Sequence, residues 1–513
     1  MKKCITILFF ATSLFLFITL RVPVNNVLAR TPSQLDLATS ARGTVDMSES
    51  GPRIKRIENG LLPAATIKGQ AVQSMQIAGR MKHYNVPGVS IAFFENGQIT
   101  WTRAYGLADV ATRKPVTPET LFQSASISKP AAALGVLRLV QDGKLSLDED
   151  VNLKLRSWKI PENEFTKEQK VTLRRILSHS AGMNIQRFPG YASDEPLPTV
   201  VQMLNGEKPA NTVPIRVDTV PGTIWRYSGG GYVAMQLLLS DVTGKAVPQL
   251  LNELVLQPIG MTRSTFEEPL PKNLWASAAT PYRENGEPVK GGWHTYPEIT
   301  PAGLWTTPSD IARMAIEVQN EYAGRSNKLL STEMMHEMLK HQKDDWGLGF
   351  ALEAPGHKLR FSHGGSNEGF RCTLQAYTEA AGQGIVIMTN GDQGWNLLNE
   401  ILRSVSREYR WPDFQPQEHT LAKLDASLLA AYAGEYEIVG GKKPVVVTLK
   451  GTHLYVQAEA LGPDEEELLP ESDLQFFVVS APLVFNFQKD DEGAVAKVTM
   501  HSDFQTMEAR KVH

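Results

Sequence analysis

The sequence predicts an α+β fold in which an antiparallel sheet is flanked by helices and joined by a helical subdomain, followed by a small all-β barrel or sandwich domain. Strand-like runs stand at residues 86–106 and return at 361–390, whereas residues 130–340 are mostly helical in pattern. Beyond residue 425, short runs alternate apolar and polar residues between Gly, Asp and Pro. Strands at both ends of a helical middle indicate one sheet completed by both ends of a domain, and the alternating tail indicates a separate β domain.

The elements follow in order along the chain. Two β-rich runs flank Asn96-Gly97, a pair that favours a tight hairpin because type I′ turns need positive φ at both central positions. The helical middle comes next. The continuously apolar run at 384–390, "GIVIMTN", is typical of a buried central strand, and "LNEILRSVSREY" after it predicts a closing helix.

Domain boundaries follow from changes in composition. Residues 30–60 are polar and aperiodic, which predicts a flexible lead-in. We expect the α+β domain at 61–412, a proline-containing linker at 413–424 and the small all-β domain at 425–513.

Residues 1–29 have the features of a signal peptide. A short basic start precedes an apolar run, and small residues ending at Ala29 offer a cleavage site. We therefore expect export to the periplasm or the cell exterior. The alternative is an uncleaved N-terminal anchor, because the apolar run is nearly long enough to span a bilayer. After cleavage only Cys372 remains, which excludes an internal disulfide.

The overall composition narrows the function. The 513 residues carry a formal net charge of -3, with 42% apolar and 21% charged residues, as in ordinary globular proteins. No basic run suggests a nucleic-acid partner. The expected partner is a small-molecule or peptide substrate, and the sequence carries no signal for an oligomeric state.

The stretch "FQSASISKP" places three serines ahead of one lysine. Ser126 and Lys129 are three residues apart and would share a helix face, whereas Ser124 and Ser128 would not share it. Serine needs a base within hydrogen-bond reach to act as a nucleophile, and burial lowers the pKa of a lysine toward that of a usable base. The alternative is that "SASIS" is only a helix cap.

Two later segments supply possible partners. Tyr227 stands just before a glycine run that opens a helix, and His363 begins "HGG" on an expected strand. Alone, the glycine run is explained as a turn and His363 as an ordinary strand residue.

Together, these segments resemble the penicillin-recognising serine hydrolases, which include class C β-lactamases, D-alanyl-D-alanine carboxypeptidases, D-aminopeptidases and related esterases. The family motifs are S-x-x-K, Y-x-N or Y-x-S, and K-T-G or H-x-G. They stand here, in the same order, as Ser126-Ile127-Ser128-Lys129, Tyr227-Ser228-Gly229 and His363-Gly364-Gly365. The resemblance covers roughly residues 70–410 and implies a β-lactamase-like fold. The tail resembles the lipocalin-like C-terminal domains of some peptidase members.

The resemblance also implies roles for individual residues. Ser126 would be the acylated nucleophile, Lys129 would take its proton, and Tyr227 would pass protons to the leaving group and the deacylating water. The oxyanion hole would consist of the backbone N–H groups of Ser126 and Ser366. The implied substrate-binding residues are His363, Gly364, Gly365 and Gly229. No metal or organic cofactor is implied.

Two residues depart from the motifs. Gly229 replaces the family's Asn or Ser, and His363 replaces a lysine, so both an amide-binding side chain and a fixed charge are missing. These changes favour an exported serine hydrolase acting on a small ester or a D-amino-acid amide or peptide. The alternatives are a class C-like β-lactamase or penicillin-binding protein, and a non-catalytic, cell-wall-related binding protein.

Other aromatic residues are weaker candidates. His179 in "LSHSAG" fits the family pattern and is interpreted as a structural turn residue. Tyr282, Trp305 and Trp346 are candidates for the cleft wall, although aromatic residues more often belong to the core.

Overall fold

The computed structural model describes residues 50–379, 382–440, 444–458, 461, 464–502 and 506–512. The expected signal peptide and residues 30–49 lie outside this range. Residues 50–60, predicted as part of a flexible lead-in, instead contain helix α1 (Ser50–Glu58). Ile54 and Ile57 are buried on its inner face. Two apolar residues three apart suffice to dock a short helix but give too little periodicity to reveal it.

Within the described residues, seven strands form one sheet in the order β4-β3-β2-β10-β9-β8-β7, with antiparallel neighbours. Strand β10, from near the domain's end, pairs with β2, from its start, which confirms the predicted completion of the sheet by both ends. The strands are β2 (Gly88–Glu95), β3 (Gln98–Asp109), β4 (Lys114–Pro115), β7 (Ala351–Glu353), β8 (Arg360–Asn367), β9 (Phe370–Tyr377) and β10 (Gly384–Thr389).

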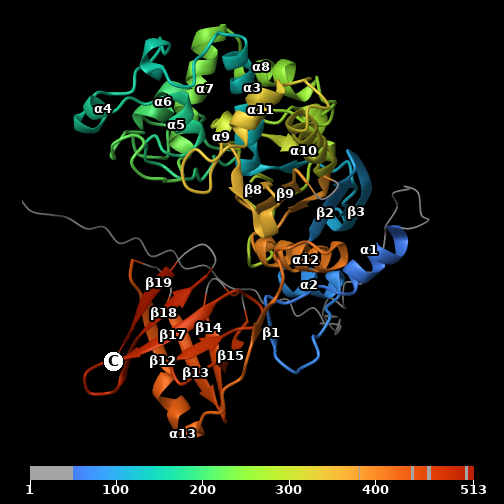
Figure 1. Cartoon of the computed structure of the whole chain (residues 1–513), viewed down its shortest axis with the longest axis vertical. Helices are drawn as coiled ribbons and strands as arrows, with labels where there is room; N and C mark the ends of the chain where they lie inside the picture. The colour runs from blue at the N-terminus through green and yellow to red at the C-terminus, as the bar shows by residue number, and fades with distance from the viewer. Residues whose placement is uncertain are drawn as a thin grey trace, which may run out of the picture. The chain divides into compact units, whose positions relative to one another are not determined.

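Successive residues of the central strands serve two different cores, since side chains alternate between the faces of a strand. Phe94 and Met388 belong to the core under the helical subdomain, whereas Phe93 and Ile387 belong to the core under α12 (Gly394–Tyr409). Figure 1 shows α12 on one side of β8 and β9, and α3, α7 and α10 on the other. The sheet is therefore buried on both faces, which explains the uninterrupted apolar run at 384–390.

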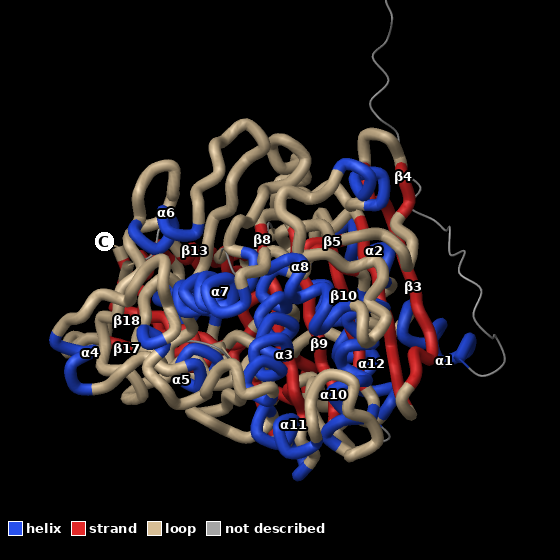
Figure 2. The backbone as a smooth tube through the Cα atoms, turned by 90° about the horizontal axis from the view of Figure 1, so that it is seen from above, coloured by secondary structure: helices blue, strands red, loops and turns tan. Residues whose placement is uncertain are grey.

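Besides α12, three helices of this domain are long and the others are short. The three long ones are α3 (Ser128–Gln141), α7 (Gly229–Thr243) and α10 (Pro308–Tyr322). The shorter ones are α2 (Ile77–His83), α4 (Glu164–Glu168), α5 (Leu173–Leu177), α6 (Val200–Asn205), α8 (Val247–Leu251), α9 (Ile299–Ala302) and α11 (Thr332–Met338). In the view of Figure 2, α3 runs between α7 and α10.

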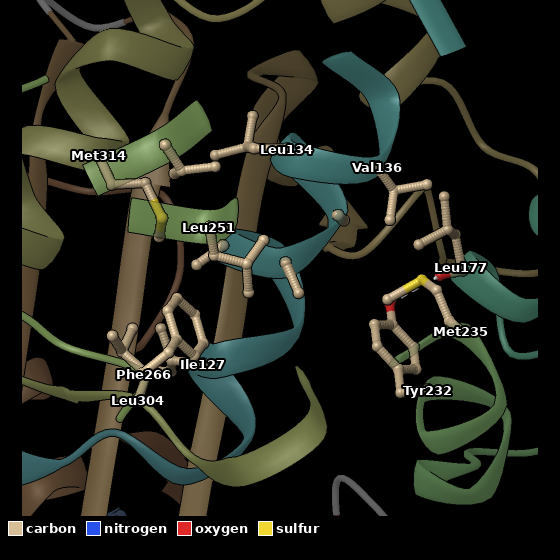
Figure 3. Close-up of a cluster of buried hydrophobic side chains, with 14 of the residues drawn as sticks. Ile127, Leu134, Val136, Leu177, Tyr232, Met235, Leu251, Phe266, Leu304 and Met314 are labelled. Carbon is tan, nitrogen blue, oxygen red and sulfur yellow. Dashed lines mark hydrogen bonds between the residues drawn. The ribbon is translucent and has the colours of Figure 1, made fainter. Parts of the chain in front are cut away.

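Helix α3 is buried on nearly every side. In Figure 3, Leu134 points toward Met314 of α10, while Val136 points toward Leu177 of α5. Such a helix cannot shift without disturbing packing on both sides, so it holds the residues at its N-terminus rigidly.

The tail is a barrel. In the part of the chain that the structure describes, eight antiparallel strands close on themselves from β12 to β19, which decides between the two predicted β architectures. They are β12 (Gly434–Ile438), β13 (Val445–Lys450), β14 (His453–Gln457), β15 (Glu466–Pro470), β16 (Gln475–Phe477), β17 (Val484–Lys489), β18 (Val495–His501) and β19 (Thr506–Lys511). Short helix α13 (Ala426–Leu429) precedes them.

The predicted linker is not wholly irregular. It contains β11 (Gln417–His419), which pairs in parallel with β1 (Ala65–Ile67). None of the described helices combines the length and apolar character needed to cross a bilayer.

Candidate active site

The three serines of "SASIS" have different environments. Ser124 and Ser128 are fully buried, and both bind the backbone of Leu304. Ser124 Oγ donates to the Leu304 carbonyl at 3.0 Å, and the Leu304 N–H donates to Ser128 Oγ at 3.0 Å. Ser128 Oγ also donates to the Ala125 carbonyl at 2.6 Å. Both hydroxyls are thus structural, which leaves Ser126 as the candidate nucleophile.

Ser126 lies in the short 3-10 helix η1 (Ala125–Ile127) that leads into α3. Helix α3 begins at Ser128, so Pro130 lies in its first turn, where a proline costs no intrahelical hydrogen bond. The preceding Ala125 has a φ of 49°, a left-handed conformation that is uncommon for a residue with a Cβ. The chain therefore turns sharply just before the candidate nucleophile.

Lys129 lies directly beside this hydroxyl. Its Nζ donates to Ser126 Oγ at 2.9 Å and to the Pro301 carbonyl at 3.0 Å. The residue is only 2% exposed, and burial lowers its pKa to about 7. A substantial fraction of the amine is therefore neutral at neutral pH, with a lone pair within reach of the Ser126 proton.

Tyr227 completes the group around Ser126. The Lys129 Nζ lies 4.9 Å from the centre of the Tyr227 ring. Burial raises the pKa of the Tyr227 hydroxyl. A hydrogen bond with Ser126 and the positive charge of Arg187 lower that pKa, but by less than burial raises it. The phenol therefore keeps its proton and can donate it to a partner.

The backbone after Tyr227 is tightly fixed. Ser228 caps α7, because its Oγ accepts from the Gly231 N–H at 3.1 Å. The same Oγ donates to the Asn184 carbonyl at 3.0 Å, and the Ser228 N–H donates to His179 Nδ1 at 3.1 Å. These contacts set the position of Tyr227 relative to Ser126.

Strand β8 carries the third segment past η1. A Cβ on Gly365 would lie only 2.2 Å from the Ser124 carbonyl oxygen, so only glycine permits this approach. Gly364 also lies on β8, where a Cβ would meet the ring of Trp395 on the other face. Ser366 follows on the same strand. The oxyanion-hole role of the Ser126 and Ser366 N–H groups stays a prediction.

His363 is buried and neutral. Its Nδ1 lies 2.6 Å from the Gly364 carbonyl and therefore carries the hydrogen, while Nε2 is buried without a partner among the described residues. Burial and the nearby positive charge of Lys129 lower its pKa to about 3. The third segment consequently supplies a polar imidazole but no positive charge.

Two aromatic side chains join the group. The ring centroid of His179 lies 4.3 Å from that of Tyr227, and the ring centroid of Trp346 lies 6.0 Å from it. By contrast, the Tyr282 hydroxyl accepts from the Val110 N–H, and Trp305 is fully buried with Nε1 donating to Glu268. Of the three aromatic candidates for the cleft wall, only Trp346 lies against these residues.

Gly229 has an unexpected neighbour. A Cβ at this position would lie 2.6 Å from Cε2 of Phe188 and 3.1 Å from the Gln186 carbonyl oxygen. The phenylalanine ring therefore occupies the space into which an Asn or Ser side chain would project. Sequence reasoning missed Phe188, because nothing in the irregular stretch 178–199 predicts which residue faces α7.

The described residues contain no group of three or more His, Cys, Asp or Glu side chains placed to hold a metal ion. The arrangement instead offers a hydroxyl, an amine with a lowered pKa and a protonated phenol. These are the groups needed for acyl transfer through serine.

Two curated proteins are similar to this chain in sequence. Penicillin-binding protein 4* of Bacillus subtilis (strain 168) is 23% identical over 424 residues, which span 78% of this chain and 90% of that protein. Esterase EstB of Burkholderia gladioli is 30% identical over 205 residues, which span 38% of this chain and 50% of that protein.

Two solved structures show the same fold. The octameric penicillin-binding protein homologue from Pyrococcus abyssi matches with a TM-score of 0.57 and 21% identity, covering 84% of this chain and 98% of that one. The D-amino acid amidase from Ochrobactrum anthropi SV3 matches with a TM-score of 0.52 and 21% identity, covering 64% of this chain and 96% of that one.

Residues 418–511 match the model of a domain of unknown function, DUF3471, which corresponds to the barrel and the strand that leads into it. Residues 76–402 match the Beta-lactamase family model. This match spans more than half of the chain, and the protein therefore belongs to the Beta-lactamase family of serine hydrolases.

Proposed function

We propose that the protein is an exported hydrolase that forms an acyl-enzyme at Ser126 with a small ester or a D-amino-acid amide or peptide. The observation that carries the proposal is the 2.9 Å contact between Ser126 Oγ and the amine of a buried Lys129, whose pKa is lowered to about 7. A buried lysine with an ordinary pKa would hold its proton and could not accept another.

In the proposed reaction, Ser126 Oγ attacks the substrate carbonyl carbon and its proton passes to the neutral Lys129 amine. The bond to the leaving group breaks as that group takes up a proton by way of the Tyr227 hydroxyl. Water then attacks the acyl carbon, the same groups return the protons, and the acid is released with Ser126 regenerated. The backbone N–H groups of Ser126 and Ser366 would hold the carbonyl oxygen, where loss of one donor typically costs ~10²–10³ in rate.

Three features favour an ester or D-amino-acid amide over a β-lactam. Gly229 offers no side chain to a substrate amide, and the neutral His363 offers no charge to a β-lactam carboxylate. Among the similar proteins, one is named an esterase and another a D-amino acid amidase.

Intact-protein mass spectrometry tests the proposal. The purified protein is mixed with p-nitrophenyl esters, D-alanyl p-nitroanilides and β-lactams, and we expect a mass increase equal to one acyl group with an ester or D-alanyl amide. Ser126→Ala should show none. An adduct that survives in Ser126→Ala would contradict the proposal.

Two further measurements separate the alternatives. Rapid nitrocefin turnover would favour a class C-like β-lactamase. A fluorophosphonate probe that fails to label the folded protein would favour a non-catalytic binding protein. Export is tested by the N-terminal sequence of the protein recovered outside the cytoplasm, which should begin after Ala29.

A further inference from the structure

The segment 184–188 is fastened to the start of α7. The Gly230 N–H donates to the Ile185 carbonyl at 3.0 Å, and Ser228 Oγ donates to the Asn184 carbonyl at 3.0 Å. Since Tyr227 immediately precedes these anchored residues, the segment is held at a fixed place beside the candidate active site.

Gly229 is what permits this course of the chain. A Cβ there would overlap the Phe188 ring at 2.6 Å, and the Gln186 carbonyl oxygen would be only 3.1 Å away. Gly229 departs from the Y-x-N or Y-x-S motif, and segment 184–188 occupies the space that the motif side chain would need. The two observations therefore have the same structural cause. Between Gln186 and Phe188, both of which approach Gly229, stands Arg187.

Arg187 is exposed, and no hydrogen bond or ion pair joins its side chain to another residue in the described ranges. Its positive charge nevertheless acts on the Tyr227 hydroxyl, where it favours the ionised form. Because its neighbours Gln186 and Phe188 both approach Gly229, Arg187 stands on the segment beside the start of α7, next to Tyr227 in the chain's course, and its hydrogen-bond donors remain available.

Neither His363 nor Lys129, the two other basic side chains described at the site, supplies a fixed positive charge. His363 stands where related motifs carry lysine, and it is neutral with a pKa of about 3. Lys129 is committed to Ser126 and the Pro301 carbonyl. A substrate anion entering this site would consequently meet its complementary charge at Arg187.

We propose that Arg187 binds a carboxylate carried by the leaving group of the substrate. This inference rests on the proposed function, in which Tyr227 protonates the leaving group and therefore marks the side on which that group departs. A guanidinium remains charged at any physiological pH and its planar fork matches a carboxylate. The preferred substrates would be esters or amides whose leaving group is a hydroxy acid or an amino acid with a free carboxylate.

Three phenyl esters test the inference. They are 3-carboxyphenyl acetate, with the charge on the leaving group; its methyl ester, which is neutral; and monophenyl succinate, with the charge on the acyl group. We expect the wild-type protein to favour the first over the second in kcat/KM, and Arg187→Gln to lower that ratio about 10-fold, as loss of one charge-assisted contact predicts. Arg187→Lys should retain part of the preference.

Arg113→Gln is the matched control, because Arg113 is an exposed arginine in the turn before β4, at the opposite edge of the sheet from β8. It should leave the ratio unchanged. An unchanged ratio in Arg187→Gln, or an effect confined to monophenyl succinate, would overturn the inference while Ser126-dependent hydrolysis of the neutral ester still upheld the proposed function. If no ester were cleaved or formed an adduct at Ser126, both would fail.

Discussion

The imidazole of His179 packs against the phenol ring of Tyr227, with 4.3 Å between ring centroids, while its Nδ1 accepts the N–H of Ser228. One side chain thus supports both the ring and the backbone of the segment that carries the candidate proton donor. His179 has a φ of 56°, which agrees with its interpretation as a turn residue and adds a second role to it.

Two substitutions separate these roles. His179→Phe keeps an aromatic ring but leaves the buried Ser228 N–H without an acceptor, so we expect unfolding free energy to fall by ~1–3 kcal/mol. His179→Asn keeps an acceptor and tolerates the left-handed backbone, but Tyr227 loses its packing partner. We expect it to lower kcat more than stability. Denaturant titration and ester kinetics measure both, and equal losses in both variants would contradict this division.

The pH dependence of acylation should follow Lys129. Only the neutral amine can accept the Ser126 proton, so kcat/KM for a neutral ester should rise with pH, with a midpoint near the pKa of about 7. Below that midpoint the rate should fall about tenfold per pH unit. His363, with a pKa of about 3, stays neutral throughout. Steady-state kinetics from pH 5 to 10 measures the profile, and a flat curve across pH 7 would exclude Lys129 as the base.

Lys129→Met should abolish most activity without unfolding the protein. General-base catalysis typically contributes ~10²–10⁴ in rate.

The wild-type lysine has its pKa lowered from 10.5 to about 7, so its contribution to stability is present above pH 10.5 and is lost as the pH falls to 7. Methionine has no such term. The melting temperature of Lys129→Met minus that of the wild type should therefore be higher below pH 7 than at pH 10. Calorimetry of both proteins at pH 6 and 10 tests the direction of this change.

Restoring the family side chain at Gly229 should be costly by itself. Gly229→Asn forces the new Cβ against Phe188, and such overpacking typically costs ~1–3 kcal/mol. Combining it with Phe188→Ala removes the overlapping ring. We expect the double variant to be more stable than the sum of the two single losses predicts. Strict additivity in a double-mutant cycle would show that the ring does not fill that space.

Glu298 should make stability depend on pH in the opposite sense to Lys129. It is 1% exposed, both carboxylate oxygens lack partners within the described ranges, and burial raises its pKa to about 8. The folded protein therefore holds a proton on Glu298 that the unfolded chain releases above about pH 4.5. The stabilisation that this proton gives the folded state is full below that pH and is lost as the pH rises through 8.

Glu298→Gln should accordingly flatten the decline in unfolding free energy between pH 5 and 9. The exposed Glu333→Gln serves as the control and should keep the wild-type slope. Identical slopes in all three proteins would show that Glu298 is ionised in the folded state.

The sequence could predict features that depend on short spacing or long patterns. Ser126 and Lys129 are one helical turn apart, so their contact follows from local geometry. The central position of β10 follows from its unbroken apolar run. That Tyr227 and His363 share a site was implied by the family resemblance and not by spacing, and their rings lie 6.3 Å apart between centroids.

Other features depend on long-range packing that no local pattern encodes. The Phe188 contact with Gly229 joins an irregular loop to a helix start. The tail closes into a barrel because β12 pairs with β19. The sequence pattern of alternating strands is the same in a sandwich and in a barrel, so it does not reveal this pairing. Helix α1 has too few apolar residues to show a period.

The pairing of β12 with β19 also limits how the tail can interact with other molecules. Among the described strands of the tail, a closed ring of hydrogen bonds leaves no unpaired backbone edge along which an extended peptide or a second copy could add itself as another strand. Recognition by this domain therefore has to depend on side chains and connecting turns.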